Sequence, residues 1–463
     1  MATWTPDPTF YPSARLAMQA PPERLAFVAM LGVGDRPKPD AVGVVDLDPE
    51  SRSYGSLVGR TDMPEPGDEL HHFGWNACSS ALCPCAPHPH LERRYLIVPG
   101  LRSSRIYILD TKPDPKRPRI VRTIEPQEVM ARSGYSRPHT LHCGPEGIYV
   151  SALGNAQGDG PGGVFLMDHD SFDVLGRWEM DRGDQELAYD VWWHLGHDTL
   201  ITSEWGTPNT VESGLVPEIL LGARYGRRLH FWDMRRRRHQ QSIDVGPDYQ
   251  LVFELRPAHD PTRAYGFVNV VVSLKDLSSS IWVWHRANGG WEMRKVIDIP
   301  AEPADPADLP PLLKDFKAVP PLATDIDLSL DDRFLYVACW GTGELRQYDV
   351  SDPFAPRLTG SVRLGGIVRR TAHPKSGPLN GGPQMVEVSR DGRRIYFTNS
   401  LYGAIDPQFY PEGIRGWMAK LDAGPDGGLK VDPDFFLEFG PAWRGHQIRL
   451  QGGDASSDSY CYP

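Results

Sequence analysis

The feature that most constrains the fold of this chain is a unit of short strands that recurs along it. The clearest copies are T-D-I-D-L-S-L-D-D-R-F-L-Y-V-A-C-W-G at 324–341 and Q-M-V-E-V-S-R-D-G-R-R-I-Y-F-T-N-S at 384–400. Each reads as an alternating apolar run, a turn with Asp or Gly, and an aromatic-aliphatic strand. The first copy continues into a third strand at 343–353 and a fourth at 358–366. Four short antiparallel strands per unit are typical of a β-propeller blade.

Weaker copies of this unit occur along most of the remaining chain, at 26–48, 93–111, 141–154, 191–206 and 249–300. The total comes to about seven units, which is within the range of propellers. We therefore predict an all-β fold, a seven-bladed β-propeller, as a single domain over 1–463. Residues 1–20 are expected to form an N-terminal arm, and residues 79–92 a loop insertion rich in Cys, His and Pro. Two stacked β domains are the alternative architecture.

The end of the chain predicts how the ring closes. After the outer-strand pattern F-F-L-E-F-G at 435–440, the chain continues as R-G-H-Q-I-R-L at 444–450, which is typical of an inner strand. The N-terminal segment has no convincing inner strand of its own. We therefore expect the C-terminal strand to join the first blade as its innermost strand, close to the central channel.

Three segments place histidines before or within apolar alternating runs: L-H-H-F-G-W at 70–75, R-P-H-T-L-H at 137–142 and R-G-H-Q-I-R at 444–449. As inner strands of consecutive blades, they would bring His72, His139 and His446 to one end of the channel. Converging imidazoles indicate a metal site. His71 is expected to be a fourth ligand or to orient the others. The two-residue period of a strand puts His142 at another level, so His139 is the preferred ligand.

Composition narrows the classes of function. A net charge of −11 argues against nucleic-acid binding, and the run of arginines at 235–238 is interpreted as a solvated hairpin. No apolar run is long enough to span a membrane. The N-terminus lacks the pattern of a secretory signal, which favours the cytoplasm. Six cysteines in so long a chain favour free thiols over a disulfide framework.

Several longer motifs resemble a known family. They are D-E-L-H-H-x-G-W-N-x-C-S-S at 68–80, P-H-T-L-H-C at 138–143, T-S-E-W-G-x-P-N at 202–209, G-G-P-Q-M at 381–385, F-Y-P-E-G-I-R-G at 409–416 and G-G-D-A-S-S-D at 452–458. From about residue 20 to its end, the chain is similar to the selenium-binding protein family, which includes methanethiol oxidases. The resemblance implies a seven-bladed propeller and copper-dependent oxidation. Methanethiol, oxygen and water would be the reactants, and formaldehyde, hydrogen sulfide and hydrogen peroxide the products.

The resemblance also assigns a cysteine, with two departures from the family pattern. Cys78 matches the selenium-binding cysteine of the family. Family members often carry C-S-S-C and G-G-D-C-S-S-D, but Ala81 and Ala455 replace the second cysteine of the first motif and the cysteine of the tail motif. A mechanism that needs a C-x-x-C disulfide is therefore doubtful in this chain, whereas one that needs only Cys78 and the histidines is not.

The loop after this motif offers two thiols and two imidazoles. A-L-C-P-C-A-P-H-P-H contains Cys83, Cys85, His88 and His90. These types of side chain bind zinc or copper, but the spacing is not that of a zinc finger. Local metal binding and a merely stiff, proline-rich loop are both open at this point.

The remaining polar candidates receive a structural or an accessory role. Glu204 and Trp205 follow a strand toward the end of the channel that holds His139. The glutamate is a candidate proton carrier or outer partner of the metal site, and the tryptophan a candidate wall of an apolar pocket. His194 is expected to face the channel further down, whereas His197 and His259 occupy turns and are expected to be structural.

These observations leave three hypotheses of function. The first is a copper thiol oxidase, with His71, His72, His139 and His446 around the metal and Cys78 as an acceptor of an intermediate or a redox partner. The second is a non-catalytic selenium or thiol carrier that uses Cys78 and no metal. The third is a metal hydrolase of the lactonase type, but such sites favour oxygen ligands and this set is rich in histidine.

Overall fold

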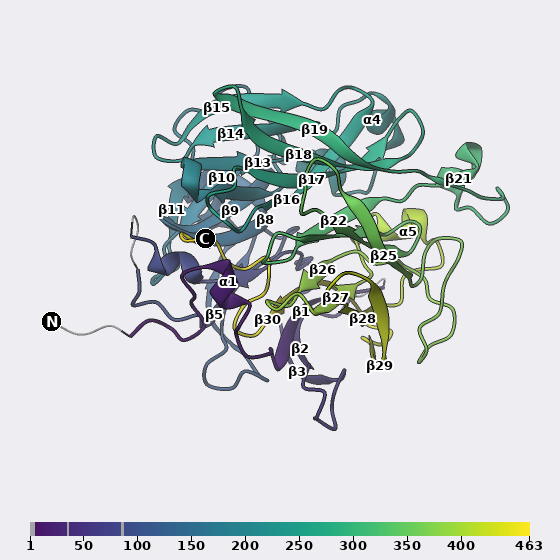
Figure 1. The fold of residues 1–463 in the computed structure, drawn as a ribbon, viewed down its shortest axis with the longest axis horizontal. Coiled ribbons are helices and arrows are strands. Elements are labelled where there is room, and N and C mark those ends of the chain that lie inside the picture. Colours follow the sequence, from purple (N-terminus) through teal and green to yellow (C-terminus); the bar gives the residue numbers. More distant parts are fainter. Residues whose placement is uncertain (1–4, 35–36, 85–87) are drawn as a thin grey trace.

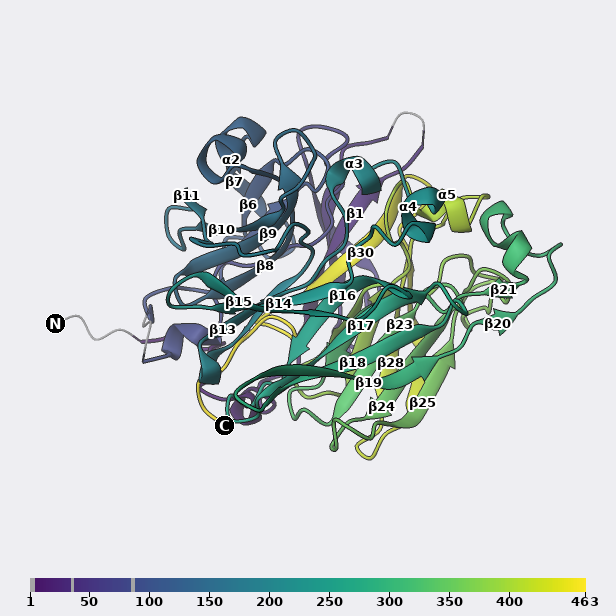
Figure 2. The same ribbon diagram turned by 90° about the horizontal axis from the view of Figure 1, so that it is seen from above.

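The strands form a closed ring of blades. In the computed structural model, which describes residues 5–34, 37–84 and 88–463, there are seven four-stranded antiparallel sheets (Figures 1 and 2). The predicted all-β, seven-bladed propeller is therefore confirmed. In each blade the strand order is the order of the chain from the inner to the outer strand, except in the first, where the last strand of the protein is innermost.

The strands of the first four blades, from inner to outer, have the following bounds. They are β30 (Trp443–Leu450), β1 (Leu25–Gly32), β2 (Ala41–Asp46) and β3 (Leu57–Asp62); β4 (Gly74–Trp75), β5 (Tyr95–Pro99), β6 (Ile106–Asp110) and β7 (Arg119–Ile124); β8 (Tyr135–Gly144), β9 (Gly147–Asn155), β10 (Gly163–Met167) and β11 (Val174–Arg177); and β12 (Val191–His194), β13 (Thr199–Thr202), β14 (Arg228–Asp233) and β15 (Arg238–Asp244).

The last three blades follow the same plan. Their strands are β16 (Tyr249–Pro257), β17 (Tyr265–Ser273), β18 (Ser279–Ala287) and β19 (Gly290–Ile299); β22 (Ala323–Leu328), β23 (Phe334–Cys339), β24 (Glu344–Asp349) and β25 (Arg357–Arg363); and β26 (Val386–Val388), β27 (Arg394–Thr398), β28 (Trp417–Ala423) and β29 (Leu429–Glu438).

Short elements lie in the connections between strands. They are the hairpin β20 (Glu302–Pro303) with β21 (Ala318–Val319), the helices α1 (Ala14–Ala17), α2 (Pro126–Ser133), α3 (Pro208–Val211), α4 (Pro217–Leu221) and α5 (Asp406–Phe409), and the 3-10 helices η1 (Ser79–Leu82), η2 (Leu195–His197) and η3 (Pro311–Phe316). Within the described residues, no helix is both long and apolar enough to cross a membrane.

Ring closure follows the prediction from the tail. β30 pairs antiparallel with β1, with Ala26 opposite Leu450 and Gly32 opposite Trp443. Every residue of β30 is buried. Figure 2 shows this yellow strand beside the purple β1, so the two ends of the chain complete one sheet. A closed ring leaves no unpaired inner edge at this seam.

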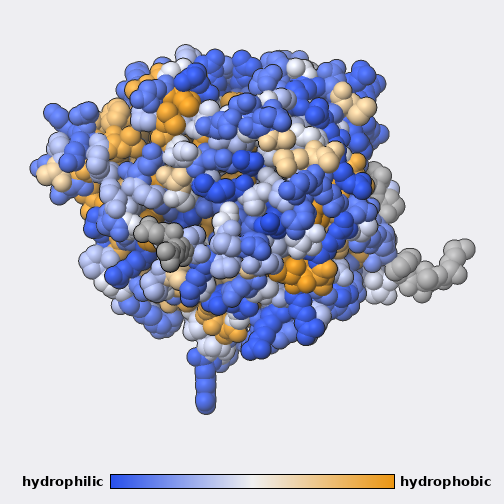
Figure 3. Space-filling model, turned by 180° about the vertical axis from the view of Figure 1, so that it is seen from behind, coloured by the Kyte–Doolittle hydropathy of each residue, from blue (hydrophilic) through white to orange (hydrophobic). Residues whose placement is uncertain are grey.

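The core lies between adjacent blades, because most inner and middle strands are covered on both faces. β23 is buried along its whole length, whereas every residue of the outer strand β25 of the same blade is exposed or partly exposed. Covered strands are rich in β-branched and aromatic residues, as expected for sheets packed on both sides. On the face in Figure 3, hydrophilic residues predominate and the apolar ones form small separate groups. The arginine run at 235–238 lies in and beside the turn between β14 and β15 and is largely exposed, as predicted.

Inner strands carry β-bulges, which the alternating sequence pattern did not predict. In β8 the register against β9 shifts between Pro138 and Leu141, so the two intervening residues oppose one. β30 has the same shift against β1, between Gly445 and Ile448. A bulge re-aims side chains away from strict alternation. The bulged residues include His139 and His446.

A belt of side-chain hydrogen bonds links these inner strands around the ring. A polar residue on the second strand of one blade, or directly after it, donates to a backbone carbonyl of the next blade. In three cases it also accepts from a backbone N–H of its own blade. The side chains that donate to a carbonyl of the next blade are Ser151 (to Tyr189, 2.5 Å), Ser203 (to Phe253, 2.6 Å), Asn269 (to Ala323, 2.7 Å) and Thr398 (to His446, 2.6 Å). The backbone N–H groups that donate to these side chains are those of Thr140 (to Ser151), Asp190 (to Ser203) and Glu254 (to Asn269).

Candidate metal centre

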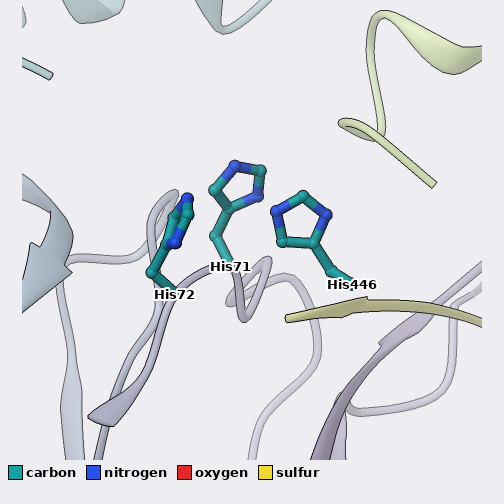
Figure 4. Close-up of side chains that lie close together, drawn as sticks. All are labelled: His71, His72 and His446. Atoms are coloured by element: carbon teal, nitrogen blue, oxygen red, sulfur yellow. The ribbon is translucent and has the colours of Figure 1, made fainter. Parts of the chain in front are cut away.

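Four histidines from three consecutive blades meet inside the ring. The ring centroid of His72 lies 4.3 Å from that of His139 and 5.5 Å from that of His446, and the rings of His71 and His446 stack at 3.7 Å. Ring nitrogens of His71, His72 and His446 lie within 4.8 Å of one another, and Figure 4 shows these three side chains side by side. All four are buried. The structure thus brings together the residues that sequence analysis assigned to one metal site.

His71 and His72 come from the segment that enters blade two, and blade one anchors this segment on both sides. The backbone N–H of Leu70 donates to the Asp40 carboxylate at 2.8 Å. The backbone N–H of Phe73, the residue after His72, donates to the Gln447 side-chain oxygen of β30 at 2.5 Å. The two imidazoles are therefore positioned by contacts between residues far apart in the chain, and the inner strand that carries His446 contributes one of these contacts.

Several ring nitrogens of the cluster have no hydrogen-bond partner in the part of the chain that the structure describes. His446 Nδ1 donates to the Ser400 carbonyl at 2.7 Å, and His139 Nδ1 lies 3.0 Å from the Thr140 hydroxyl. The buried nitrogens without a partner are Nδ1 of His71, both nitrogens of His72, and Nε2 of His139 and His446. Buried polar atoms are rarely left unpaired, and imidazole nitrogen is a ligand for copper and zinc. The donor set therefore fits a copper ion.

Burial keeps these imidazoles neutral. It lowers the pKa of His446 to about 4, although the hydrogen bond to the Ser400 carbonyl acts in the opposite direction. The pKa values of His71, His72 and His139 also lie well below the ordinary histidine value, because of burial and then of the neighbouring histidines. A metal ligand must be in this neutral form.

An apolar cavity of about 40 Å³ opens beside His71. Its wall includes Tyr189, Trp205, Phe253 and Tyr402. The expectation that Trp205 walls a small apolar pocket is confirmed. A cavity of this size has room only for a very small molecule next to the histidine cluster.

Glu204 takes part in a different network, so the structure does not bring it to the histidine cluster. Its carboxylate accepts hydrogen bonds from His230 Nε2 at 2.9 Å and from the backbone N–H groups of Arg227 and Arg228 at 3.0 Å. Both carboxylate oxygens are thereby used. Successive side chains in an extended segment point to opposite sides, so Trp205 at the cavity directs its neighbour Glu204 away from it.

Cys78 lies at another level of the fold. Its Sγ is 3.2 Å from the Cys143 carbonyl and 3.0 Å from the Ser80 hydroxyl. Cys143 follows His139 by four residues on β8, which corresponds to about 13 Å along an extended strand. Burial acts to raise the pKa of Cys78, but hydrogen bonds with the Cys143 side chain and Ser80 lower that pKa below the ordinary thiol value. Cys78 is therefore a buried thiol with a lowered pKa, apart from the histidine cluster.

The expectation that all cysteines are free is wrong for Cys83 and Cys461, which form a disulfide with Cα atoms 5.7 Å apart. The tail returns to the start of η1, where Ser79 donates to the Asp458 carboxylate at 2.8 Å, and this brings Cys461 to the loop. Cys83 is thus not available for the local metal site considered for this loop, and Cys85 lies outside the described residues. Cys78, Cys143 and Cys339 are free and buried.

The other histidines singled out in the sequence lie outside the cluster. His142 packs against the Trp192 ring at 3.9 Å, and His194 Nε2 donates to the Arg263 carbonyl at 2.9 Å. His259 contacts the Asp332 carboxylate and the Ala455 carbonyl, which confirms its structural role. His197 lies in η2 between two strands, as expected of a turn residue.

Sequence analysis missed the charged residues that brace the cluster. Arg444 pairs with Glu69 at 2.8 Å and with Asp406 at 3.2 Å, and it donates to the Ser400 hydroxyl at 2.7 Å. Ser400 is the residue whose carbonyl orients His446. One signal was available in the sequence. Arg444 lies two positions before His446, Glu69 lies two positions before His71, and these two side chains carry opposite charges.

Comparison with known proteins agrees with this architecture. Over residues 4–461 the chain matches the family described as 56kDa selenium binding protein (SBP56). It is 38% identical to the methanethiol oxidase of Xenopus laevis, with 97% of each chain covered, and 38% identical to that of Homo sapiens, with 96% of each covered. The solved structure of a hypothetical selenium-binding protein from Sulfolobus tokodaii has a TM-score of 0.96 and 60% sequence identity, covering 99% of this chain and 100% of that one. The chain therefore belongs to the selenium-binding protein family.

Proposed function

We propose that this protein is a copper-dependent methanethiol oxidase, with His71, His72, His139 and His446 as the copper ligands. The observation that carries the proposal is the set of buried ring nitrogens without a partner beside an apolar cavity. The relatives named methanethiol oxidase, from Xenopus laevis and Homo sapiens, support the substrate. The overall reaction converts methanethiol, oxygen and water to formaldehyde, hydrogen sulfide and hydrogen peroxide.

The residues of the chain have distinct roles in this proposal. A bound copper supplies one-electron redox chemistry and lowers the pKa of a coordinated thiol. The Ser400 carbonyl holds the proton on Nδ1 of His446 and thereby leaves Nε2 for the metal. Trp205 and Phe253 surround the methyl group of the substrate and exclude water from the site.

The test combines metal content with oxygen uptake. Protein loaded with copper is expected to hold about one ion per chain and to consume oxygen when methanethiol is added, with formaldehyde as a product. His139→Ala should lose most of the copper and the activity, because it removes one of the few ligands of the site.

A matched control lies on the same strand. His142→Ala removes a buried imidazole of β8 that packs against Trp192 rather than joining the cluster. It should keep its copper. Full copper content in His139→Ala, or equal losses in both variants, would contradict the proposed ligand set.

The alternative is a selenium or thiol carrier that uses Cys78 without a metal. Cys78 donates a hydrogen bond to the Cys143 carbonyl and lies apart from the histidines, and this position is what favours the alternative. Metal-free protein that binds selenite fully, loses that binding in Cys78→Ser and shows no oxygen uptake after copper loading would support the carrier and overturn the oxidase.

A further inference from the structure

A second group of metal-ligating side chains lies beside Cys78, away from the four-histidine cluster. Cys143 Sγ is 3.4 Å from His169 Nε2, and the rings of His169 and His88 stack at 4.4 Å. One ligand atom of each of these three residues lies within 4.8 Å of the other two. The group shares no residue with the four-histidine cluster.

Three separate segments supply these side chains. Cys143 lies near the end of β8, His169 in the turn between β10 and β11, and His88 in the loop between η1 and β5. Nothing in the local sequence of the turn or of the loop brings their histidines close to the buried thiol of β8. Their convergence results from the packing of blade two against blade three.

The separation of the Cys143 sulfur and one imidazole nitrogen agrees with tetrahedral coordination. Zinc binds thiolate sulfur at about 2.3 Å and imidazole nitrogen at about 2.0–2.1 Å, so the two ligand atoms lie about 3.5 Å apart in a tetrahedron. The separation of Cys143 Sγ and His169 Nε2 is 3.4 Å. One sulfur and two imidazole ligands suit zinc and related borderline metals, and a water completes the fourth position.

The site has a fixed frame, and one of its ligands is partly exposed at the surface. Cys143 and His88 are buried, whereas His169 is partly exposed at the surface. The backbone N–H of His88 donates to the Ala81 carbonyl at 3.3 Å, which ties the loop to η1. The Cys83–Cys461 disulfide fastens the end of η1 to the tail. The ligand from the loop is therefore held in place before any metal arrives.

We propose that Cys143, His169 and His88 form a second metal site that binds a zinc-class divalent cation. On binding, the Cys143 thiol forms a sulfur–metal bond and releases its proton to water, with no change of oxidation state. The carbonyl of Cys143 lies 3.2 Å from Cys78 Sγ, so the metal would sit close to the buried Cys78 thiol. The inference does not depend on the oxidase proposal.

The test uses a signal that the four-histidine cluster cannot produce. Metal-free full-length protein is titrated with Co²⁺ in thiol-free buffer, and the thiolate-to-cobalt charge-transfer absorption in the near ultraviolet is recorded. A site made only of imidazoles has no thiolate and gives no such band. The wild-type protein is expected to show the band and to lose it when Zn²⁺ is added.

Variants identify the sulfur and its partners. Cys143→Ser should abolish the band, and His169→Gln, at a partly exposed turn, should weaken cobalt binding at least about tenfold. Cys78→Ser, His446→Ala and Cys339→Ser should keep it. Absence of the band in the wild type, its persistence in Cys143→Ser, or unchanged affinity in His169→Gln would overturn the proposal, and so would loss of the band in Cys78→Ser alone.

Discussion

At the level of single residues, the imidazoles of the cluster differ in how they are oriented. The backbone carbonyl of Ser400 orients His446, whereas His139 has the hydroxyl of the adjacent Thr140 at 3.0 Å from its Nδ1. Groups that hold a metal-ligating histidine in place often matter for affinity nearly as much as the ligand, because they set its tautomer and angle.

Thr140→Val is therefore expected to weaken copper binding about tenfold without removing a ligand. The valine keeps the shape of the side chain and removes only the hydroxyl next to His139. Competition with a copper chelator measures the affinity. Thr140→Ser restores a hydroxyl and should restore binding, whereas equal affinity of wild type and Thr140→Val would show that this contact does not orient the ligand.

A buried acid far from the cluster makes stability depend on pH. Glu179 accepts a hydrogen bond from Arg182 at 2.9 Å and one from the backbone N–H of Val164 at 3.3 Å. Burial nevertheless raises the pKa of Glu179 to about 7, against the opposing effect of Arg182. The folded protein thus binds a proton more tightly at this position than the unfolded chain does.

The sign of the effect follows from linkage. The stabilising contribution of the protonated Glu179 is complete below the pKa of the unfolded chain, and it is lost as the pH rises toward 7. The free energy of unfolding of the wild type, measured relative to Glu179→Gln, should therefore fall between about pH 4.5 and pH 7. A difference between the two proteins that stays constant with pH, in parallel denaturant titrations, would refute this assignment.

At the level of elements, the inner strands are shaped by bulges and joined by the belt of side-chain hydrogen bonds. Ser151 of β9 accepts from the Thr140 N–H of the bulge in β8 and donates to the Tyr189 carbonyl of the next blade. One hydroxyl thus supports both the bulge that contains His139 and the contact between blades three and four. A bulge leaves backbone groups outside the regular ladder, so such a partner is needed.

Ser151→Ala is expected to lower the free energy of unfolding by about 1–3 kcal/mol, because it leaves a buried N–H without an acceptor. It should also weaken copper binding, because the bulge of His139 loses its support. Asn269→Ala removes the corresponding belt residue of blade five and should destabilise the protein while leaving copper affinity nearly unchanged. Urea unfolding and chelator competition on both variants test the distinction, which fails if Ser151→Ala binds copper like the wild type.

At the level of the whole molecule, β30 has two roles. It completes the sheet of blade one along β1, and it delivers His446 to a cluster whose other members come from blades two and three. The tail beyond it adds a buried ion pair of Asp458 with Arg93 at 2.7 Å and the disulfide of Cys461 with Cys83. Closure and site assembly therefore depend on the same segment.

Deleting residues 442–463 should destabilise the protein and abolish copper binding, since it opens the ring and exposes the edge of β1. His446→Ala should abolish most copper binding with only a small change in melting temperature, because the substitution leaves β30 in place. Thermal melting and copper content of the two proteins separate the roles. A truncated protein that melts like the full chain and retains its copper would contradict both.

The sequence by itself determined the blades, because strand alternation and turn residues are local signals that recur in every unit. It also determined the closing strand, since the first blade lacked an inner strand and the tail supplied one. The convergence of His71, His72, His139 and His446 followed from that topology. Periodicity within one blade and order along the chain were sufficient for these conclusions.

Only the tertiary structure decided the details of the sites. The bulges at His139 and His446 are set by pairing with neighbouring strands, and no sequence pattern within β8 or β30 predicts them. The Glu204 carboxylate accepts a hydrogen bond from His230 instead of facing the cluster, and Cys83 forms a disulfide with Cys461, 378 residues away in the sequence. Such pairings depend on which surfaces the closed ring brings into contact, and the physical cause is packing between segments that are remote in sequence.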